Sequence, residues 1–239
     1  MSIIKKVSRR DALGLLGLSG AALSLGCGSG SSTTPTATTG TATTGGSTTS
    51  GACAATPTET LGPYPSLTNF VRSDIREGKS GLPLALTITI VNTGNSCLPV
   101  ANAAVDIWQC DAQGQYSEYS QPGYNGSGQT FLRGIQTTDA SGRVTFTTVF
   151  PGWYQGRATH IHVEVKVNNS VVKVTQIAFE EGLIAAVYAT AVYAAKGRNP
   201  TSNASDMVFA DSLASETATI TGGDATSGYS AAFTVSINS

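Results

Sequence analysis

The sequence has few charged residues and few metal-binding residues, and each shortage excludes a class of protein. Only 12% of the 239 residues are charged and the formal net charge is −1, so there is no basic surface for nucleic acid. The apolar run 12–25 is shorter than the ~20 residues that a membrane-spanning helix needs. None of the four cysteines belongs to a C-x-x-C pair, which argues against a zinc or thiol-redox site.

Glycine and small polar residues are abundant instead. The chain has 27 glycines among many threonines, valines and serines, a composition that favours strands joined by turns. Its length is sufficient for one domain with a substantial core. We therefore expect a single all-β domain, built as a β-sandwich or a closed β-barrel.

Residues 1–27 resemble an export signal. The segment Ser8–Leu13 carries the arginine pair of a twin-arginine leader and precedes an apolar run. Leu23–Cys27 resembles a lipoprotein cleavage site, although Ser24 stands where a leucine is usual. The sequence therefore predicts an exported protein, periplasmic, extracellular or at the cell surface. A membrane tether through lipidated Cys27 is one form that this export can take.

A linker is predicted over residues 28–55, ahead of a folded domain at 56–239. The linker consists almost entirely of Gly, Ser, Thr, Ala and Pro. Such a composition buries too little apolar surface to offset the entropy lost on ordering, so we expect this segment to be disordered.

Three cysteines lie beyond the leader, at positions 53, 97 and 110. Export favours disulfide formation. An extended strand over 103–110 places Cys97 and Cys110 beyond the ~7 Å Cα separation that a disulfide allows. We expect Cys53 to pair with one of the other two, and the sequence leaves open which one.

Alternating apolar residues predict strands over 82–91, 103–110, 129–137, 143–149, 160–167, 171–179, 217–221 and 231–237. One helix is predicted over Glu180–Ala195, where an apolar stripe ends before Gly197. A three-residue loop after the fifth strand pairs Gln176 opposite His162. Without a repeat or a second domain, the prediction is an all-β β-sandwich with one short helix.

The only two histidines, His160 and His162, are one residue apart on a predicted strand. Side chains at i and i+2 share a face, with Cα atoms about 6.5–7 Å apart, so both imidazoles can reach one metal ion. A chance pair at a polar strand edge is the alternative. Tyr154 lies shortly before them, and Tyr116 follows a glycine turn. Because phenolate is a hard anionic donor, this set suits Fe(III) better than zinc or copper(I).

Four segments carry specific motifs: Asp106–Ser117, Phe131–Gly134, Pro151–His162 and Thr175–Gln176. In this order they closely resemble the intradiol ring-cleavage dioxygenases, nearest to the exported relatives of protocatechuate 3,4-dioxygenase and catechol 1,2-dioxygenase. The likeness runs from about Thr56 to the C-terminus. It implies a transthyretin-like β-sandwich holding non-haem Fe(III).

The resemblance also implies a ligand set and a reaction. The residues at the family's iron ligands are Tyr116, Tyr154, His160 and His162. The substrates implied are a small catechol-type aromatic diol and O₂, and the product is a cis,cis-muconate-type diacid. Tyr154 would also take up substrate protons, and Arg157 would stabilise anionic states of the ring. Gln176 would donate hydrogen bonds near the diol.

Simpler interpretations stay open for several of these residues. Arg157 also fits a surface ion pair, and Gln176 fits ordinary strand polarity. Leu61 stands where the family has a glutamate, which leaves the substrate-side contacts open. Tyrosines that fit either the pocket mouth or loop packing are Tyr64, Tyr119 and Tyr124. Arg133 is expected to hold a turn.

Two further functions are alternatives to the dioxygenase. The first is an exported transthyretin-like binding module without catalytic iron, although such a module has no need for all four ligand positions. The second is a zinc or copper hydrolase, which is disfavoured because no Glu or Asp adjoins the histidine pair as a general base.

Overall fold

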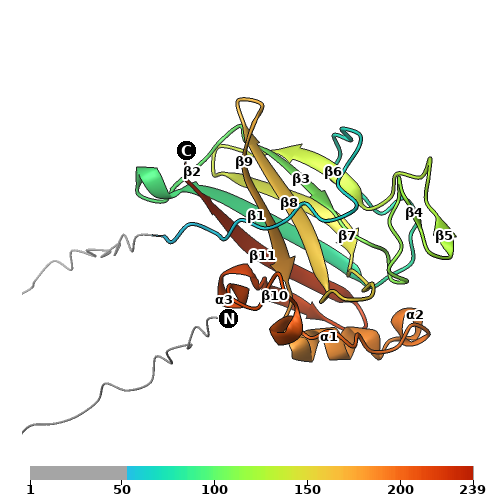
Figure 1. Ribbon diagram of the computed structural model, residues 1–239. Helices are drawn as coiled ribbons and strands as arrows, with labels where there is room; N and C mark the ends of the chain where they lie inside the picture. Colours follow the sequence, from blue (N-terminus) through green and yellow to red (C-terminus); the bar gives the residue numbers. More distant parts are fainter. Residues whose placement is uncertain (1–52, 239) are drawn as a thin grey trace, which may run out of the picture. The chain divides into compact units, whose positions relative to one another are not determined.

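The computed structural model describes residues 53–238 (Figure 1). The expected export signal, Cys27 and nearly all of the expected linker lie outside these residues. Within 53–238, no helix has both the length and the hydrophobicity needed to cross a bilayer.

The larger sheet has five strands with β1 (Pro83–Asn92) at its centre. β1 pairs in parallel with β11 (Gly228–Ile237) and antiparallel with β7 (Arg143–Val149). β10 (Thr219–Asp224) extends the sheet beyond β11, and β2 (Leu98–Pro99) pairs with the end of β1. Buried and more exposed residues alternate along β1, so only one face of this strand enters the core.

The second sheet has four antiparallel strands in the order β6–β3–β8–β9. They are β6 (Arg133–Thr137), β3 (Ala104–Trp108), β8 (His160–Val167) and β9 (Ser170–Ala178). The first four residues of β8 are all buried. Both faces of this sheet are therefore covered at the end where β8 begins.

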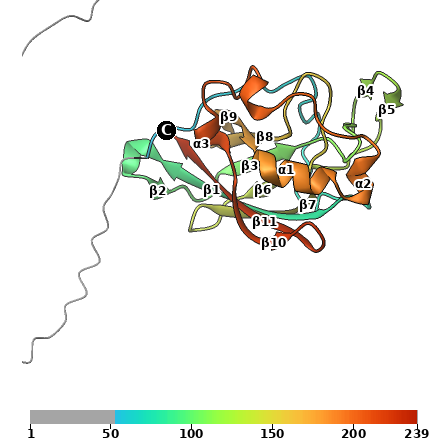
Figure 2. The ribbon, with the colours of Figure 1, turned by 90° about the horizontal axis from the view of Figure 1, so that it is seen from below.

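The two sheets form a sandwich around one apolar core (Figures 1 and 2). β1 supplies Leu86 and Ile88, while β8 supplies Ile161 and Val163, and all four are fully buried. Burial of this apolar surface is the main stabilising contribution to the fold. Since Ile161 and Val163 point inward, the alternation of β8 directs His160 and His162 to the outer face of their sheet.

The all-β class is confirmed, and the structure has a few short helices where one was predicted. The helix predicted over 180–195 is divided into α1 (Glu181–Tyr188) and α2 (Ala191–Ala194). Thr190 between them is extended, and its hydroxyl donates to the carbonyl of Val187 at 2.7 Å. Both helices lie at the end of the sandwich where β8 begins, and α1 is in front of the sheets in Figure 2.

Other short elements were not predicted. They are α3 (Leu213–Glu216), the 3-10 turns η1 (Thr93–Asn95) and η2 (Asn203–Ser205), and the hairpin of β4 (Ser120–Gln121) and β5 (Tyr124–Asn125).

The predicted strand bounds are confirmed for β7 and β8, and so is the pairing of His162 opposite Gln176. The predicted three-residue loop is wrong: the turn contains only Asn168 and Asn169, and a β-bulge between Val165 and Lys166 restores the register. Cys53 forms a disulfide with Cys97, so the expected bridge involves this partner. Cys110 is a free, buried thiol. The bridge joins the start of the described chain to the turn after β1.

Candidate functional site

The pairing of β3 with β8 brings the sequence-predicted site residues together. The two strands are antiparallel, and Trp108 at the end of β3 pairs with His162 near the start of β8. The loop after β3, which carries Tyr116, therefore lies at the same sheet end as the loop before β8, which carries Tyr154.

An extended segment, 56–66, covers the outer face of the sheet over this region. The Gln176 amide donates to the carbonyl of Thr60 at 2.9 Å, and the Ser66 hydroxyl donates to Asp106 at 3.3 Å. Gly62 has a positive φ of 69°, and a Cβ there would lie 2.8 Å from Cε1 of His162. Only glycine allows the segment to pass this close to the imidazole.

The two imidazoles face one another in the interior. His160 is 2% and His162 is 1% exposed, and their Nε2 atoms are 3.1 Å apart. Nδ1 of His160 lies 2.7 Å from the carbonyl of Ala158, which can only accept, so Nδ1 carries the proton and Nε2 keeps its lone pair. The ring of His162 stacks on Trp108, with centroids 4.9 Å apart and planes 4° from parallel.

Both predicted tyrosines join the histidines. The phenol oxygen of Tyr154 is 3.4 Å from Nε2 of His160. The ring of Tyr116 lies 5.7 Å from that of Tyr154, edge to face. Tyr116 is fully buried, and its hydroxyl has no hydrogen-bond partner among residues 53–238. A buried hydroxyl without a partner is costly, so this oxygen points to a ligand.

Burial sets the protonation of all four groups. It lowers the pKa of His160 to about 3 and that of His162 well below its usual value, so both rings are neutral at pH 7. Burial also raises the pKa of Tyr154 to about 12 and that of Tyr116 well above 10. The phenols therefore ionise only if a strong cation lies beside them.

Arg157 lies beside the four residues in a partly buried ion pair. Its Nε donates to Asp206 at 2.9 Å and its Nη2 donates to Gln176 at 2.6 Å. Asp206 is fully buried, so the surface ion pair considered for Arg157 is not what the structure shows. Gln176 is also fully buried and connects Arg157 to the covering segment. Asp206 lies 49 residues from Arg157 and has no motif of its own in the sequence.

Arg133 holds the loops behind Tyr116, as predicted. Its side chain is 1% exposed, and it donates to the carbonyls of Tyr64 at 3.0 Å and Ser117 at 2.7 Å. It also forms an ion pair with Glu118 at 3.1 Å. Arg133 thus joins the covering segment to the loop that carries Tyr116.

A cavity of about 500 Å³ opens beside Tyr154. Aromatic side chains on its wall are Tyr64, Tyr124, Trp153 and Tyr154 itself. Tyr119 instead packs on Tyr64 with ring centroids 5.4 Å apart and donates to the carbonyl of Pro65. Of the three tyrosines considered for the pocket mouth, Tyr64 and Tyr124 line this cavity.

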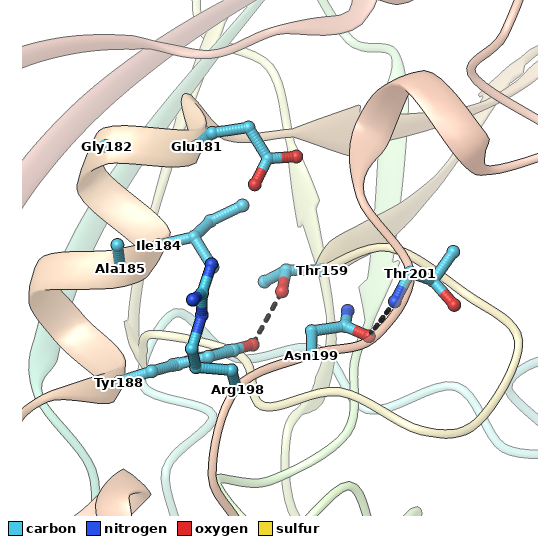
Figure 3. A pocket seen from close by; sticks show the side chains of 9 residues that line it. All are labelled: Thr159, Glu181, Gly182, Ile184, Ala185, Tyr188, Arg198, Asn199 and Thr201. Atoms are coloured by element: carbon cyan, nitrogen blue, oxygen red, sulfur yellow. Dashed lines mark hydrogen bonds between the residues drawn. The ribbon is translucent and has the colours of Figure 1, made fainter.

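A smaller cavity of about 250 Å³ lies against α1 (Figure 3). The Thr159 hydroxyl and the Tyr188 phenol, which hydrogen-bond at 2.6 Å, form part of its wall. Glu181, Arg198 and Asn199 also line it. None of the four converging residues lines this cavity, whereas Tyr154 lines the larger one.

No group of three or more His, Cys, Asp or Glu side chains suited to a metal occurs within 53–238. The candidate site differs from such a group because half of its donors are phenols. Two neutral imidazoles and two phenol oxygens fit a hard, strongly Lewis-acidic ion better than zinc.

Comparison with known proteins agrees with this geometry. A family model described as Dioxygenase matches residues 65–209. An intradiol ring-cleavage dioxygenase from Tetranychus urticae is 30% identical with a TM-score of 0.73, over 78% of this chain and 95% of its own. No curated protein matches the chain.

Two more distant structures show the fold alone. The dioxygenase domain of a dioxygenase carbohydrate-binding protein fusion from Streptomyces sp. SirexAA-E is 24% identical, with a TM-score of 0.59 over 77% of this chain and 99% of its own. Catechol 1,2-dioxygenase from Pseudomonas arvilla C-1 is 18% identical, with a TM-score of 0.54 over 77% and 62%. Since the family model and the 30% identical structure each cover more than half of the chain, the chain belongs to the intradiol ring-cleavage dioxygenases.

Proposed function

We propose that this protein is a non-haem Fe(III) dioxygenase that cleaves the ring of catechol-type aromatic diols with O₂ to cis,cis-muconate-type diacids. The observation that carries the proposal is the convergence of two neutral imidazoles and two phenols around one point. The 3.1 Å separation of the histidine Nε2 atoms and the unpartnered hydroxyl of Tyr116 support it most directly.

The four residues that would hold Fe(III) are Tyr116, Tyr154, His160 and His162. When bound, the ion supplies the Lewis acidity that ionises the phenols and makes a chelated catechol reactive toward O₂. The fit rests on the donor set, because phenolate oxygens favour a trivalent ion.

Tyr154 is the residue best placed to receive a substrate proton. It is only half-buried and lines the 500 Å³ cavity, whereas Tyr116 is fully enclosed. Away from a bound ion, burial raises the pKa of this phenol to about 12, so Tyr154 would keep a proton taken from an incoming diol. Tyr116 has no such access and serves as a fixed donor.

Arg157 would stabilise negative charge on the diol oxygens and the opened ring. Its guanidinium is permanently charged, and two of its nitrogens are already fixed by Asp206 and Gln176. A donor held in place before the reaction stabilises developing charge at little reorganisation cost. Gln176 thus acts mainly by orienting Arg157.

The test is a visible absorption spectrum of the full chain reconstituted with iron, before and after anaerobic addition of catechol. We expect a broad phenolate-to-Fe(III) charge-transfer band that shifts when catechol binds. Tyr116→Phe removes one donor and should weaken the band, while Tyr119→Phe is the matched control and should leave it unchanged. A colourless protein without bound iron would overturn the proposal and favour the transthyretin-like binding module.

We also propose that the protein acts outside the cytoplasm, tethered to a membrane through lipidated Cys27. The leader motif supports export, and the Cys53–Cys97 disulfide suits an oxidising compartment. Fractionation of cells expressing the full chain and its Cys27→Ser variant tests this. We expect both chains to be exported and only the unaltered chain to remain with the membrane. Retention of both chains in the cytoplasm would refute the proposed location.

A further inference from the structure

Asp206 makes three hydrogen bonds at the edge of the candidate site. Its Oδ2 accepts from Nε of Arg157 at 2.9 Å and from the backbone N–H of Ala158 at 2.5 Å. Its Oδ1 accepts from the N–H of Val208 at 2.8 Å. The carboxylate is fully buried, so these protein groups take the place of solvent.

These contacts connect Asp206 to the guanidinium of Arg157 and, through Ala158, to His160. Arg157 and Ala158 are neighbours in the chain, so one carboxylate oxygen fixes a side chain and the next peptide. The carbonyl of Ala158 in turn accepts from Nδ1 of His160 at 2.7 Å, which leaves Nε2 of that ring unprotonated. A shift of Ala158 would move this acceptor, and Nδ1 would then no longer be fixed as the protonated nitrogen of His160.

The segment around Asp206 is itself rigidly held. The turn η2 precedes it and is closed by reciprocal hydrogen bonds between Ser202 and Ser205. Phe209, fully buried, packs near the Arg157 guanidinium at 5.9 Å and near the His160 ring at 6.5 Å. Asp206 is therefore presented by a packed loop that contacts the same two site residues.

A carboxylate is required here and an amide does not replace it. All three partners are N–H donors, so both oxygens must accept. Burial alone would raise the pKa of Asp206, but the N–H groups of Ala158 and Val208 and the charge of Arg157 lower it below its usual value. In an asparagine, the amide nitrogen would face at least one of these donors.

We propose that Asp206 is a positioning residue for this site, which sets the orientation of Arg157 and the tautomer of His160 through one buried carboxylate. The catalytic part of this inference rests on the proposed ring-cleavage function. The positioning part concerns the protein alone and is measurable without iron.

The first measurement uses the fact that the chain has only two histidines. ¹⁵N-histidine NMR of the full chain should show His160 as a single Nδ1–H tautomer that is protected from solvent. In Asp206→Asn this signal should become a tautomer mixture or exchange with water. Asp211→Asn is the matched control, since Asp211 is an exposed acid in the same segment, and should retain the unaltered spectrum.

The second measurement is steady-state cleavage of catechol by the iron-loaded chain. Asp206→Asn should lower kcat by about 10–100-fold, with a smaller change in KM. In an Arg157→Lys background the further loss should be below about 3-fold, because residues that act as a unit are non-additive. Asp211→Asn should keep unaltered kinetics.

Losses that multiply in the double variant, or an unaltered His160 signal in Asp206→Asn, would overturn the inference while the proposed function stands. Absence of iron binding and ring cleavage in the unaltered chain would instead refute the proposed function. If Asp206→Asn does not fold, Asp206→Glu retains the charge but displaces the carboxylate. It should still disturb the His160 tautomer, and an undisturbed tautomer would also refute the inference.

Discussion

The two sheets of the sandwich are made of similar strands but are covered differently. β1, in the five-stranded sheet, alternates between core-facing and outward-facing residues and turns its outer face to solvent. β8 is buried on both faces where it begins, because segment 56–66 and the loop of Asp206 cover its outer side. Polar residues can be fully buried on β8 because that second layer supplies partners. Mutations in the two sheets should therefore affect different properties.

The largest contrast is expected from His160→Ala. Removal of one donor should lower kcat/KM for catechol by about 10³-fold, on the scale of losing one essential polar group at an active site. Removal of this buried ring also leaves a cavity and an unpaired Ala158 carbonyl, so the variant should lose about 1–3 kcal/mol of unfolding free energy. Iron content, ring cleavage and the denaturant midpoint are measured together. Substantial iron-dependent activity in this variant would break the contrast.

Ile88→Ala tests the other sheet. Ile88 is fully buried in the core side of β1. Its truncation should therefore cost about 2–5 kcal/mol of unfolding free energy. Urea denaturation measures this loss. The kcat of the folded fraction should remain close to that of the unaltered protein. A large fall in kcat would show that the two sheets are not functionally separate.

Asp106→Asn sharpens the comparison through pH. Asp106 lies on the covered face of β3, and burial raises its pKa from 3.8 to about 7. The raised pKa means that the folded state favours the protonated form, so stability is retained below pH 4 and falls as pH rises toward 7. The variant should match the unaltered protein at pH 4 and exceed it by about 1–3 kcal/mol at pH 8. Chemical denaturation from pH 4 to pH 8 measures the unfolding free energy of both proteins. The same pH dependence of this free energy in both would contradict the prediction.

The smallest effect is expected at Thr87, on the outer face of β1. Its hydroxyl lies 3.3 Å from that of Thr145 on β7, on the side away from the core. Thr87→Val should change the unfolding free energy by no more than about 0.5 kcal/mol and leave catalysis unchanged. The denaturant midpoint checks this. A larger loss would mean that the outer face of this sheet is also covered in solution.

Much of the fold follows from local pattern. Alternation alone places β7 and β8 at their observed bounds. Gln176 lies opposite His162 because a two-residue turn at Asn168 and Asn169 is combined with a β-bulge between Val165 and Lys166, and the alternation does not show that bulge. The helix expected over 180–195 is divided because Thr190 is extended, a choice that apolar spacing does not encode. The hairpin β4–β5 is too short to show a period.

The candidate site was also predictable only in part, because local pattern shows some of its residues and not others. The histidine pair and Tyr154 fall within one compact motif, and Tyr116 follows a recognisable turn. Asp206 lies in a loop with no periodicity, and only tertiary packing brings it to Arg157. A partly buried arginine needs an acidic partner, but the sequence offers many acids and no means of selecting one.

The disulfide between Cys53 and Cys97 has a mechanical consequence. Segment 56–66 rests on the site through Thr60 and Gly62, and it begins directly after Cys53. A pulling force on the chain ahead of Cys53 enters the protein through a covalent bond to the turn after β1. The load therefore bypasses the covering segment, which would otherwise be the first part to peel away. A protein held by its N-terminal end can thus bear tension without uncovering its histidines.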